Sequence, residues 1–193
     1  AETNALHTRP ITNPSSKMVK LKVFKMNPFA LELIKTSCYY FKENNLKVVK
    51  CLDNLNESDV WHRPNEASNA IGNQVLHLCG NIHQYVISSL GNKKDIRNRA
   101  LEFSKRNGYS KKELITLINQ KINDAVKVIT ELDEKDLLKI YLVQTYSFSG
   151  IQILIHATEH FSYHTGQIVF WIKYLINKDL GFYANQNLNG KAS

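Results

Sequence analysis

The sequence predicts an all-α protein, an antiparallel four-helix bundle with one longer crossover connection. Four long segments carry apolar residues at three- to four-residue spacing, helix-start signals precede most of them, and strand-like alternation is scarce. The chain has 193 residues and 43% hydrophobic content, which suits a single domain with a substantial core. We expect this domain to span residues 25–180.

The first predicted helix begins at Asn27-Pro28 and runs to about Asn54. Asn is a preferred N-cap, and Pro is favoured at the first helical position. A loop that contains Trp61-His-Arg-Pro64 follows. The second predicted helix starts near Ser68 or Asn69 and runs to about Leu90, because Gly91 is typical of a helix C-terminus.

Residues 91–109 are basic and lack a helical period, so the sequence predicts an irregular segment there. The third predicted helix opens with a capping box, Ser110 to Glu113, and runs to about Leu132. Residues 133–148 are predicted to form a connection with a short helical piece near 134–140. The fourth helix opens at Ser149 to Gln152, again with capping-box spacing, and runs to about residue 177. We expect a disordered tail or leader over residues 1–24 and a loose tail over 181–193.

The charge and the composition limit the classes of binding partner that we expect for this chain. The formal net charge is +8, but lysines outnumber arginines and no dense arginine and aromatic patch is present, so we expect no specific nucleic-acid partner. No apolar run reaches the roughly 18 residues that a membrane span needs. Cys38, Cys51 and Cys79 have no CxxC spacing, which predicts buried thiols and a cytoplasmic location. Apolar residues late in the fourth helix, Phe170, Trp171 and Tyr174, could support a homodimer.

The pattern richest in chemistry is a set of three histidines, His156, His160 and His164, at four-residue spacing in the fourth predicted helix. Residues four apart lie on the same face of a helix, so these imidazoles form a stripe. Two imidazoles one turn apart can supply half of a transition-metal site. The spacing favours neither the 156/160 pair nor the 160/164 pair, and the unused histidine would hold a ligand in place or face a substrate.

A third ligand would have to come from another helix, and His77 in the second predicted helix is the best candidate. Bundles often build metal sites from side chains on facing helices. Three ligands would leave a coordination position open, as in catalytic sites. A histidine on an apolar helix is more often a hydrogen-bonded core residue, and that reading is the alternative for His77. Gly80 and Gly166 are expected where helices approach closely.

The segment from Glu159 to Ile168 resembles the closing motif of the DinB/YfiT superfamily, in which HxxxH is followed by a Gly-Gln-Ile type of ending. The segment from Asn69 to His77 is similar to the second helix of that superfamily, and Trp61-His-Arg-Pro64 is similar to its preceding loop. The resemblance covers roughly residues 25–178.

The resemblance implies a divalent metal held by His77, His160 and His164, with Zn or Ni favoured and Fe or Mn as alternatives. His156 then lies outside the ligand set. Many relatives carry an acidic residue one turn after the first histidine, and this chain has Asn81 there, which predicts an altered charge balance at the metal. We expect Asn81, Arg63 and Gln167 to be residues of the substrate pocket.

The superfamily includes enzymes that transfer low-molecular-weight thiols such as bacillithiol, mycothiol or glutathione to electrophiles. The resemblance therefore implies a metal-dependent thiol S-transferase of the detoxification or stress type, whose partners are a small-molecule thiol and an electrophile. Two alternatives stay open at this point. One is a hydrolase in which the metal activates water. The other is a metal- or ligand-binding stress protein without catalytic activity.

Overall fold

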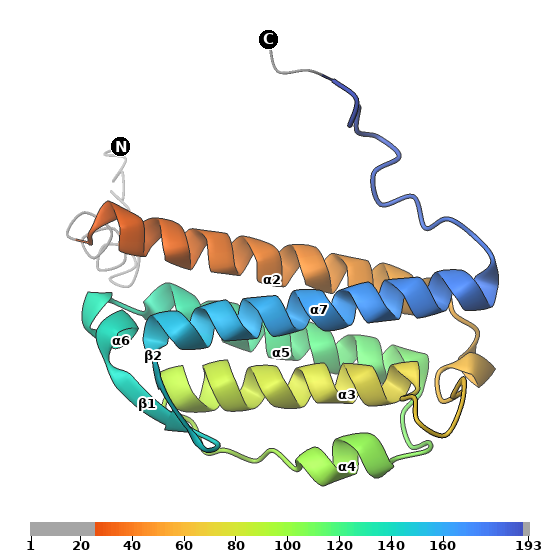
Figure 1. Ribbon diagram of the computed structural model, residues 1–193, viewed down its shortest axis with the longest axis horizontal. Helices are drawn as coiled ribbons and strands as arrows, with labels where there is room; N and C mark the ends of the chain where they lie inside the picture. The colour runs from red at the N-terminus through yellow and green to blue at the C-terminus, as the bar shows by residue number, and fades with distance from the viewer. Residues whose placement is uncertain (1–25, 191–193) are drawn as a thin grey trace, which may run out of the picture.

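The computed structural model describes residues 26–190, and its main body is a bundle of four long helices (Figure 1). Helix α2 spans Pro28–Asn54, and α3 spans Ile71–Ile82 and continues without a break into the π-helical segment η2, His83–Leu90. Helix α5 spans Lys111–Glu131 and α7 spans Gly150–Ile176. The predicted helical bundle is confirmed.

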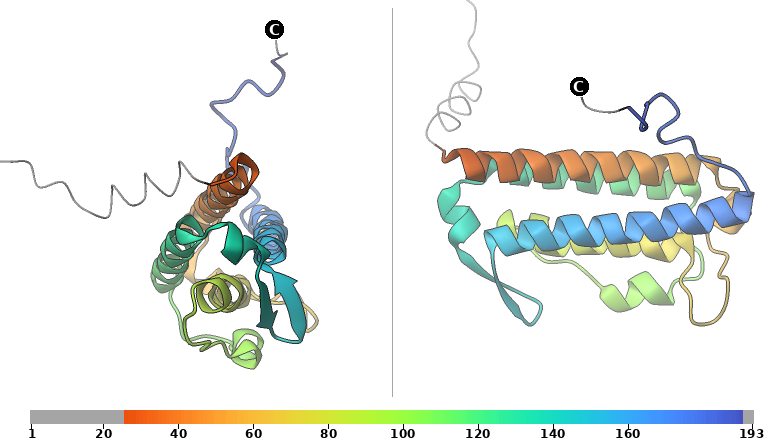
Figure 2. Two further views of the ribbon diagram at one scale, coloured as in Figure 1. Left: turned by 90° about the vertical axis from the view of Figure 1, so that its left-hand side faces the viewer. Right: turned by 45° about the horizontal axis from the view of Figure 1, so that its top comes forward.

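The helices run in two directions. Helices α2 and α7 run the same way, and α3 and α5 run the opposite way, as the colour order in Figures 1 and 2 shows. Because α3 and α5 run the same way, the chain must cross the length of the bundle between them. Residues 91–110 make this crossover; the sequence predicted a longer crossover connection without placing it, and an irregular segment over residues 91–109. They carry a short helix, α4, Arg99–Ser104, which packs against α3 and which the sequence analysis missed.

Capping side chains fix the helix starts. Asn27 caps α2 by accepting from the backbone N–H of Phe29, and Pro28 is the first helical residue. Ser110 with Glu113 forms the predicted capping box of α5, and Ser149 with Gln152 forms that of α7. Each box satisfies backbone N–H groups that have no partner within the helix. Helix α3 begins at Ile71, two to three residues later than predicted.

The connection over residues 133–148 contains the expected short helix, α6, Glu134–Leu138, and a hairpin that was not expected. Strand β1, Ile140–Val143, pairs antiparallel with β2, Tyr146–Ser149, with Val143 opposite Tyr146. Gln144 in the turn has a φ of 54°. Two-residue hairpins usually place Gly or Asn at such positions, so the Gln-Thr turn gave no recognisable signal.

The core lies between the four helices. Phe41 of α2 meets Phe161 of α7 edge-on, with ring centroids 5.8 Å apart, and both side chains are fully buried. The three cysteines are free and buried, as predicted. Glycine 166 corrects an expectation, since no atom lies within 4 Å of the position its Cβ would take, so it marks no close helix contact. None of the helices over residues 26–190 is long and apolar enough to cross a membrane.

The predicted tail over residues 1–24 lies outside the described residues. Residues 181–190, part of the predicted C-terminal tail, form turns and lead away from the bundle (Figure 1).

Candidate metal centre

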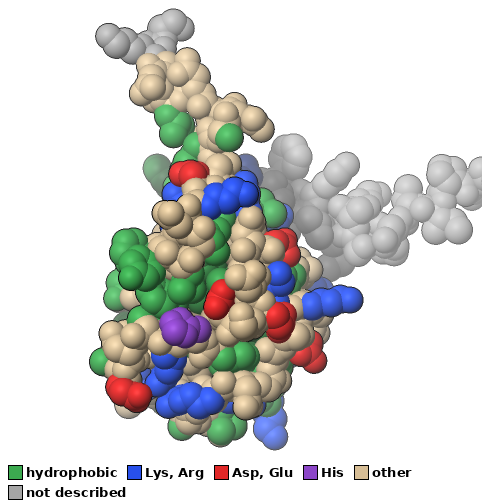
Figure 3. All heavy atoms as spheres, turned by 90° about the vertical axis from the view of Figure 1, so that its right-hand side faces the viewer, with side chains coloured by type: hydrophobic (Ala, Val, Ile, Leu, Met, Phe, Trp, Pro, Cys, Tyr) green, Lys and Arg blue, Asp and Glu red, His purple; other side chains and the backbone are tan. Residues whose placement is uncertain are grey.

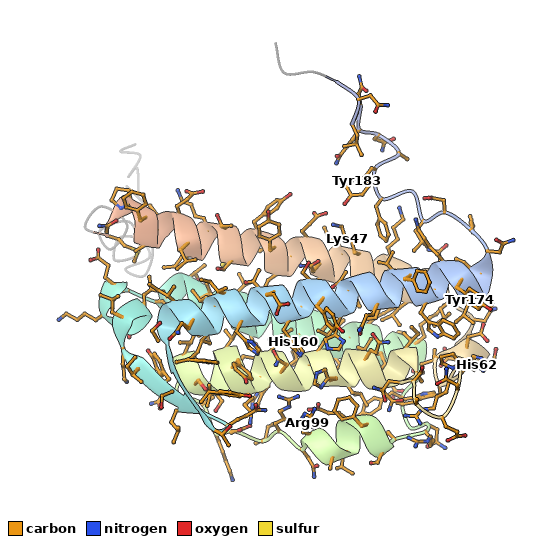
Figure 4. The ribbon with its side chains drawn as sticks, in the orientation of Figure 1. Lys47, His62, Arg99, His160, Tyr174 and Tyr183 are labelled. Carbon is orange, nitrogen blue, oxygen red and sulfur yellow. The ribbon has the colours of Figure 1, made fainter. Side chains whose placement is uncertain are left out.

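Three histidines from two helices meet inside the bundle. His77 comes from α3, and His160 and His164 come from successive turns of α7. One ring nitrogen from each lies within 4.8 Å of the other two, and the Nε2 atoms of His77 and His160 are 3.1 Å apart. Figure 4 shows His160 on the side of α7 that faces α3. This arrangement could bind a divalent metal ion.

The protonation state of the cluster suits a metal. Burial, together with the neighbouring histidines, lowers the pKa of His160 to about 3. Burial also lowers the pKa of His164 to about 4, with His77 contributing. Both imidazoles are therefore neutral at pH 7, which is the form that ligates metals. The Nδ1 atoms of His160 and His164 are buried and have no hydrogen-bond partner among the described residues. Nitrogen donors gathered without partners fit an imidazole-bound cation.

His77 is held in place by Glu102 of α4. The Nδ1 atom of His77 lies 2.9 Å from Glu102 Oε2, and the carboxylate also accepts from Arg97 Nε at 2.8 Å and Arg97 Nη2 at 2.9 Å. All three side chains are at most 8% exposed. The Nδ1 of His77 also lies 3.1 Å from Arg97 Nη2. Because the closer partner, Glu102 Oε2, can only accept, we assign the proton to Nδ1 of His77, which leaves Nε2 with a lone pair that faces His160.

The charge of Glu102 depends on these partners. Burial alone would raise its pKa, but the hydrogen bonds from Arg97 and His77 outweigh burial and lower the pKa below its usual value. The carboxylate is thus ionised at neutral pH. A carboxylate that receives the far N–H of a ligating histidine orients the ring and increases its basicity.

Gly80 makes this contact possible. A Cβ on residue 80 would lie 1.9 Å from Glu102 Oε1 and 3.1 Å from Arg97 Nε. The absence of a side chain at Gly80 therefore lets α4 place its carboxylate directly against α3. Asn73, which like Gly80 belongs to α3, also holds α4 in place, because its Nδ2 donates to the backbone carbonyls of Glu102 and Lys105.

Glu102 changes the expectation drawn from Asn81. The resemblance predicted that the loss of an acidic residue after His77 alters the charge at the metal, but a carboxylate reaches His77 from α4 instead. Sequence analysis missed it because Glu102 falls in a segment predicted to be irregular. The available signal was a single glutamate flanked by apolar residues, Leu101 and Phe103, within a basic stretch.

A pocket of about 340 Å³ adjoins the cluster, and both His77 and His164 line it. Of the predicted pocket residues, Gln167 lines it. Arg63 does not line it but donates from Nη2 to Asn69, which does. Asn81 is buried one turn after His77, lies outside the lining, and has no partner for its Oδ1 among the described residues.

His156 lies on the same stripe of α7 but outside the three-nitrogen group. Its ring packs against Tyr85, with centroids 4.4 Å apart, and lies 5.7 Å from the ring of His160. Burial lowers its pKa, so it too is neutral at pH 7.

The sequence profile of a family described as proteins of unknown function, DUF1572, matches residues 29–184. No curated protein matches the chain. Among solved structures, a DinB-like protein from Bacillus subtilis is similar with a TM-score of 0.60 and 17% identity, covering 77% of this chain and 96% of that one. A conserved protein from Enterococcus faecalis gives a TM-score of 0.63 at 12% identity, covering 75% and 97%. A DinB-like protein from Bacillus cereus gives 0.59 at 16% identity, covering 76% and 94%. At these identities the likeness establishes the DinB-like fold.

Proposed function

We propose that this chain, which belongs to the DUF1572 family and has a DinB-like fold, is a metal-dependent enzyme that transfers a low-molecular-weight thiol to an electrophile. The observation that carries the proposal is the cluster of three imidazoles, with the pKa values of His160 and His164 lowered, beside an open pocket. His77, His160 and His164 would hold the metal, with Zn or Ni favoured by the nitrogen donors. A metal bound there would stabilise a thiol as the thiolate at neutral pH.

The protein's own residues would then position the reactants. Glu102 keeps the Nε2 of His77 unprotonated and directed at the cluster, and the pocket lined by Gln167 would hold the electrophile next to it. In the transfer, the thiol sulfur forms a bond to an electrophilic carbon, a leaving group such as chloride departs with the bonding electron pair, and the thiol proton passes to solvent. Holding the two reactants together would supply much of the rate enhancement.

The lining of the pocket favours thiol transfer over hydrolysis. No aspartate or glutamate lines it, and Glu102 is already engaged by Arg97 and His77. No carboxylate of the pocket or cluster is therefore free to act as a general base toward water.

Metal content tests the site. We expect about one equivalent of Zn or Ni in untagged protein by elemental analysis, and a loss of at least tenfold in affinity for His77→Ala, His160→Ala and His164→Ala. His156→Ala is the matched control, because it removes an imidazole from the same stripe of α7 and should keep the metal. Retention of stoichiometric metal by all three cluster variants would reject the site.

Turnover tests the reaction. The metal-loaded protein should form an S-conjugate from glutathione or bacillithiol and 1-chloro-2,4-dinitrobenzene, detected by mass spectrometry, and His160→Ala should not. Hydrolysis of p-nitrophenyl acetate without conjugate formation would favour the hydrolase, and a metal-loaded protein inactive toward both would favour a binding protein.

A further inference from the structure

The residues that line the pocket beside the histidine cluster indicate which kind of ligand the pocket accepts. Its volume of about 340 Å³ lies within the range of small-molecule sites, and two candidate metal ligands, His77 and His164, line it. A molecule bound there lies directly next to the proposed reaction centre, so the side chains of the lining select the substrate.

Flat rings dominate one part of the pocket. Phe103, Phe170 and Trp171 line it, and the Phe170 side chain is 72% exposed. Trp171 is nearly parallel to two further rings, Tyr174 at 5.3 Å and 12° and His62 at 6.3 Å and 8°. Figure 4 shows His62 and Tyr174 at the same end of the bundle, and Figure 3 shows hydrophobic side chains gathered at this end beside a histidine. A lining with three aromatic side chains, one of them largely exposed, favours a flat ring ligand over a globular one.

The lining of the pocket lacks permanently charged side chains. None of the lining residues is an aspartate, glutamate, lysine or arginine. Among the described residues, three arginines contact lining residues but do not line the pocket, and each is already engaged: Arg63 with Asn69, Arg99 over the ring of Phe103, and Arg97 with Glu102. A charged group placed in this pocket would lose water without gaining a counterion, which is unfavourable.

Amide groups supply the polar contacts instead. Asn69, Gln74 and Gln167 line the pocket, and each side chain offers both donors and an acceptor. Three polar atoms of lining residues, Gln74 Oε1, Trp171 Nε1 and His164 Nδ1, are buried and have no partner among the described residues. Gln74 Oε1 is an acceptor and Trp171 Nε1 a donor, so a ligand that presents an N–H and a carbonyl oxygen together matches these two side chains.

We propose that this pocket binds an uncharged, flat ring compound that carries a carboxamide or a similar group, and that this compound is the electrophile. The proposal rests on the proposed function only for the ligand's role as electrophile. The binding preference itself follows from the pocket and does not require a metal.

Binding to the metal-free full chain at pH 7.5 tests the pocket by itself. The probes are 2-naphthamide, its anionic counterpart 2-naphthoate and the non-aromatic cyclohexanecarboxamide, measured by isothermal titration calorimetry. We expect 2-naphthamide to bind at least tenfold more tightly than either of the others. Phe170→Ala, which alters an exposed side chain, should weaken 2-naphthamide binding three- to tenfold, the range of an aromatic contact worth about 0.5–1.5 kcal/mol.

Two further variants complete the design. Gln167→Leu should weaken 2-naphthamide binding by removing an amide partner. Phe29→Ala is the matched control, because Phe29 is 88% exposed at the start of α2 and does not line this pocket. Equal binding of 2-naphthoate and 2-naphthamide, no saturable binding, or unchanged binding in Phe170→Ala would overturn the inference.

The two proposals fail separately. If the cluster variants keep their metal while 2-naphthamide still binds as described, the proposed function is wrong and the pocket inference stands. If metal and S-conjugate are found but 2-naphthoate binds as tightly as the amide, the function stands and the ligand class is wrong.

Discussion

A methyl group at position 80 should separate Glu102 from His77 of the candidate metal centre. In Gly80→Ala, Glu102 Oε1 must retreat by about 1.5 Å to reach an ordinary contact distance of 3.4 Å from the new Cβ. The carboxylate is a flexible side-chain end, so it can move, but movement on this scale breaks its hydrogen bonds to Arg97 and His77. Loss of such a partner of a ligating histidine typically lowers metal affinity about 10- to 100-fold.

Glycine 166 provides the matched control, because it is also helical but has nothing within 4 Å of its Cβ position. Replacement of a helical Gly by Ala stabilises a helix by up to about 1 kcal/mol. Gly166→Ala should therefore raise the free energy of unfolding without changing metal affinity. In Gly80→Ala, lost hydrogen bonds to charged groups, about 1.5–3 kcal/mol each, offset that gain.

Competition with a coloured zinc chelator at pH 7.5 measures the affinities, and urea unfolding measures the stabilities. Co²⁺ absorption spectra of the two variants add a readout of ligand geometry that a general loss of stability would not alter. If Gly80→Ala binds zinc as tightly as Gly166→Ala and gives the same Co²⁺ spectrum, Glu102 does not position His77 and the reasoning is refuted.

Three more predictions follow from single observations. The lowered pKa values of His160 and His164, about 3 and about 4, mean that the metal-free protein is fully stabilised above the unfolded pKa near 6.5 and loses stability as pH falls toward the folded values. Each of the two groups can lower the free energy of unfolding by at most about 1.4 kcal/mol per pH unit. Because both side chains are partly exposed, we expect a total loss of about 1 kcal/mol between pH 7.5 and 5.5. If the double variant His160→Gln/His164→Gln shows the same pH dependence of stability as the unaltered protein, this prediction is contradicted. Ser149→Ala should cost about 1 kcal/mol in urea unfolding, because it removes the cap of α7, whereas Ser147→Ala in β2 should cost less. Burial raises the pKa of Cys79 to about 12, so its thiol should react with Ellman's reagent at pH 8 only after unfolding, and rapid reaction in the native protein would show that α3 opens locally.

Local chemistry explains how much of the fold the sequence could predict. The starts of α2, α5 and α7 were found because Asn27, Ser110 and Ser149 act within three residues of their own position. The hairpin was missed because its turn lacks Gly and Asn. Helix α4 was missed because six residues are too few to show a periodic pattern, and what holds it is a set of contacts to α3 through Asn73 and Gly80. Those contacts exist only once the chain is folded.

In the candidate site, too, the sequence predicted what lies within one helix but not how two helices face each other. Periodicity placed three histidines on one face of α7, but it could not choose between the two pairs, and only the resemblance selected His160 and His164. The choice is made physically by the register of two antiparallel helices. His77 faces His160 and His164, and eight residues further along, Tyr85 faces His156, which lies eight residues before His164.

This register leaves His156 without an imidazole across from it. Successive positions of the stripe are about 6 Å apart along α7, from a rise of about 1.5 Å per residue, so one facing histidine can share an ion only with neighbours on adjacent turns. An imidazole opposite His156 would have had to occupy position 85, where the chain carries a buried tyrosine that donates to Gln144 of the hairpin turn. The hairpin and the helix register thus confine the candidate metal centre to the end of the stripe that opens on the pocket.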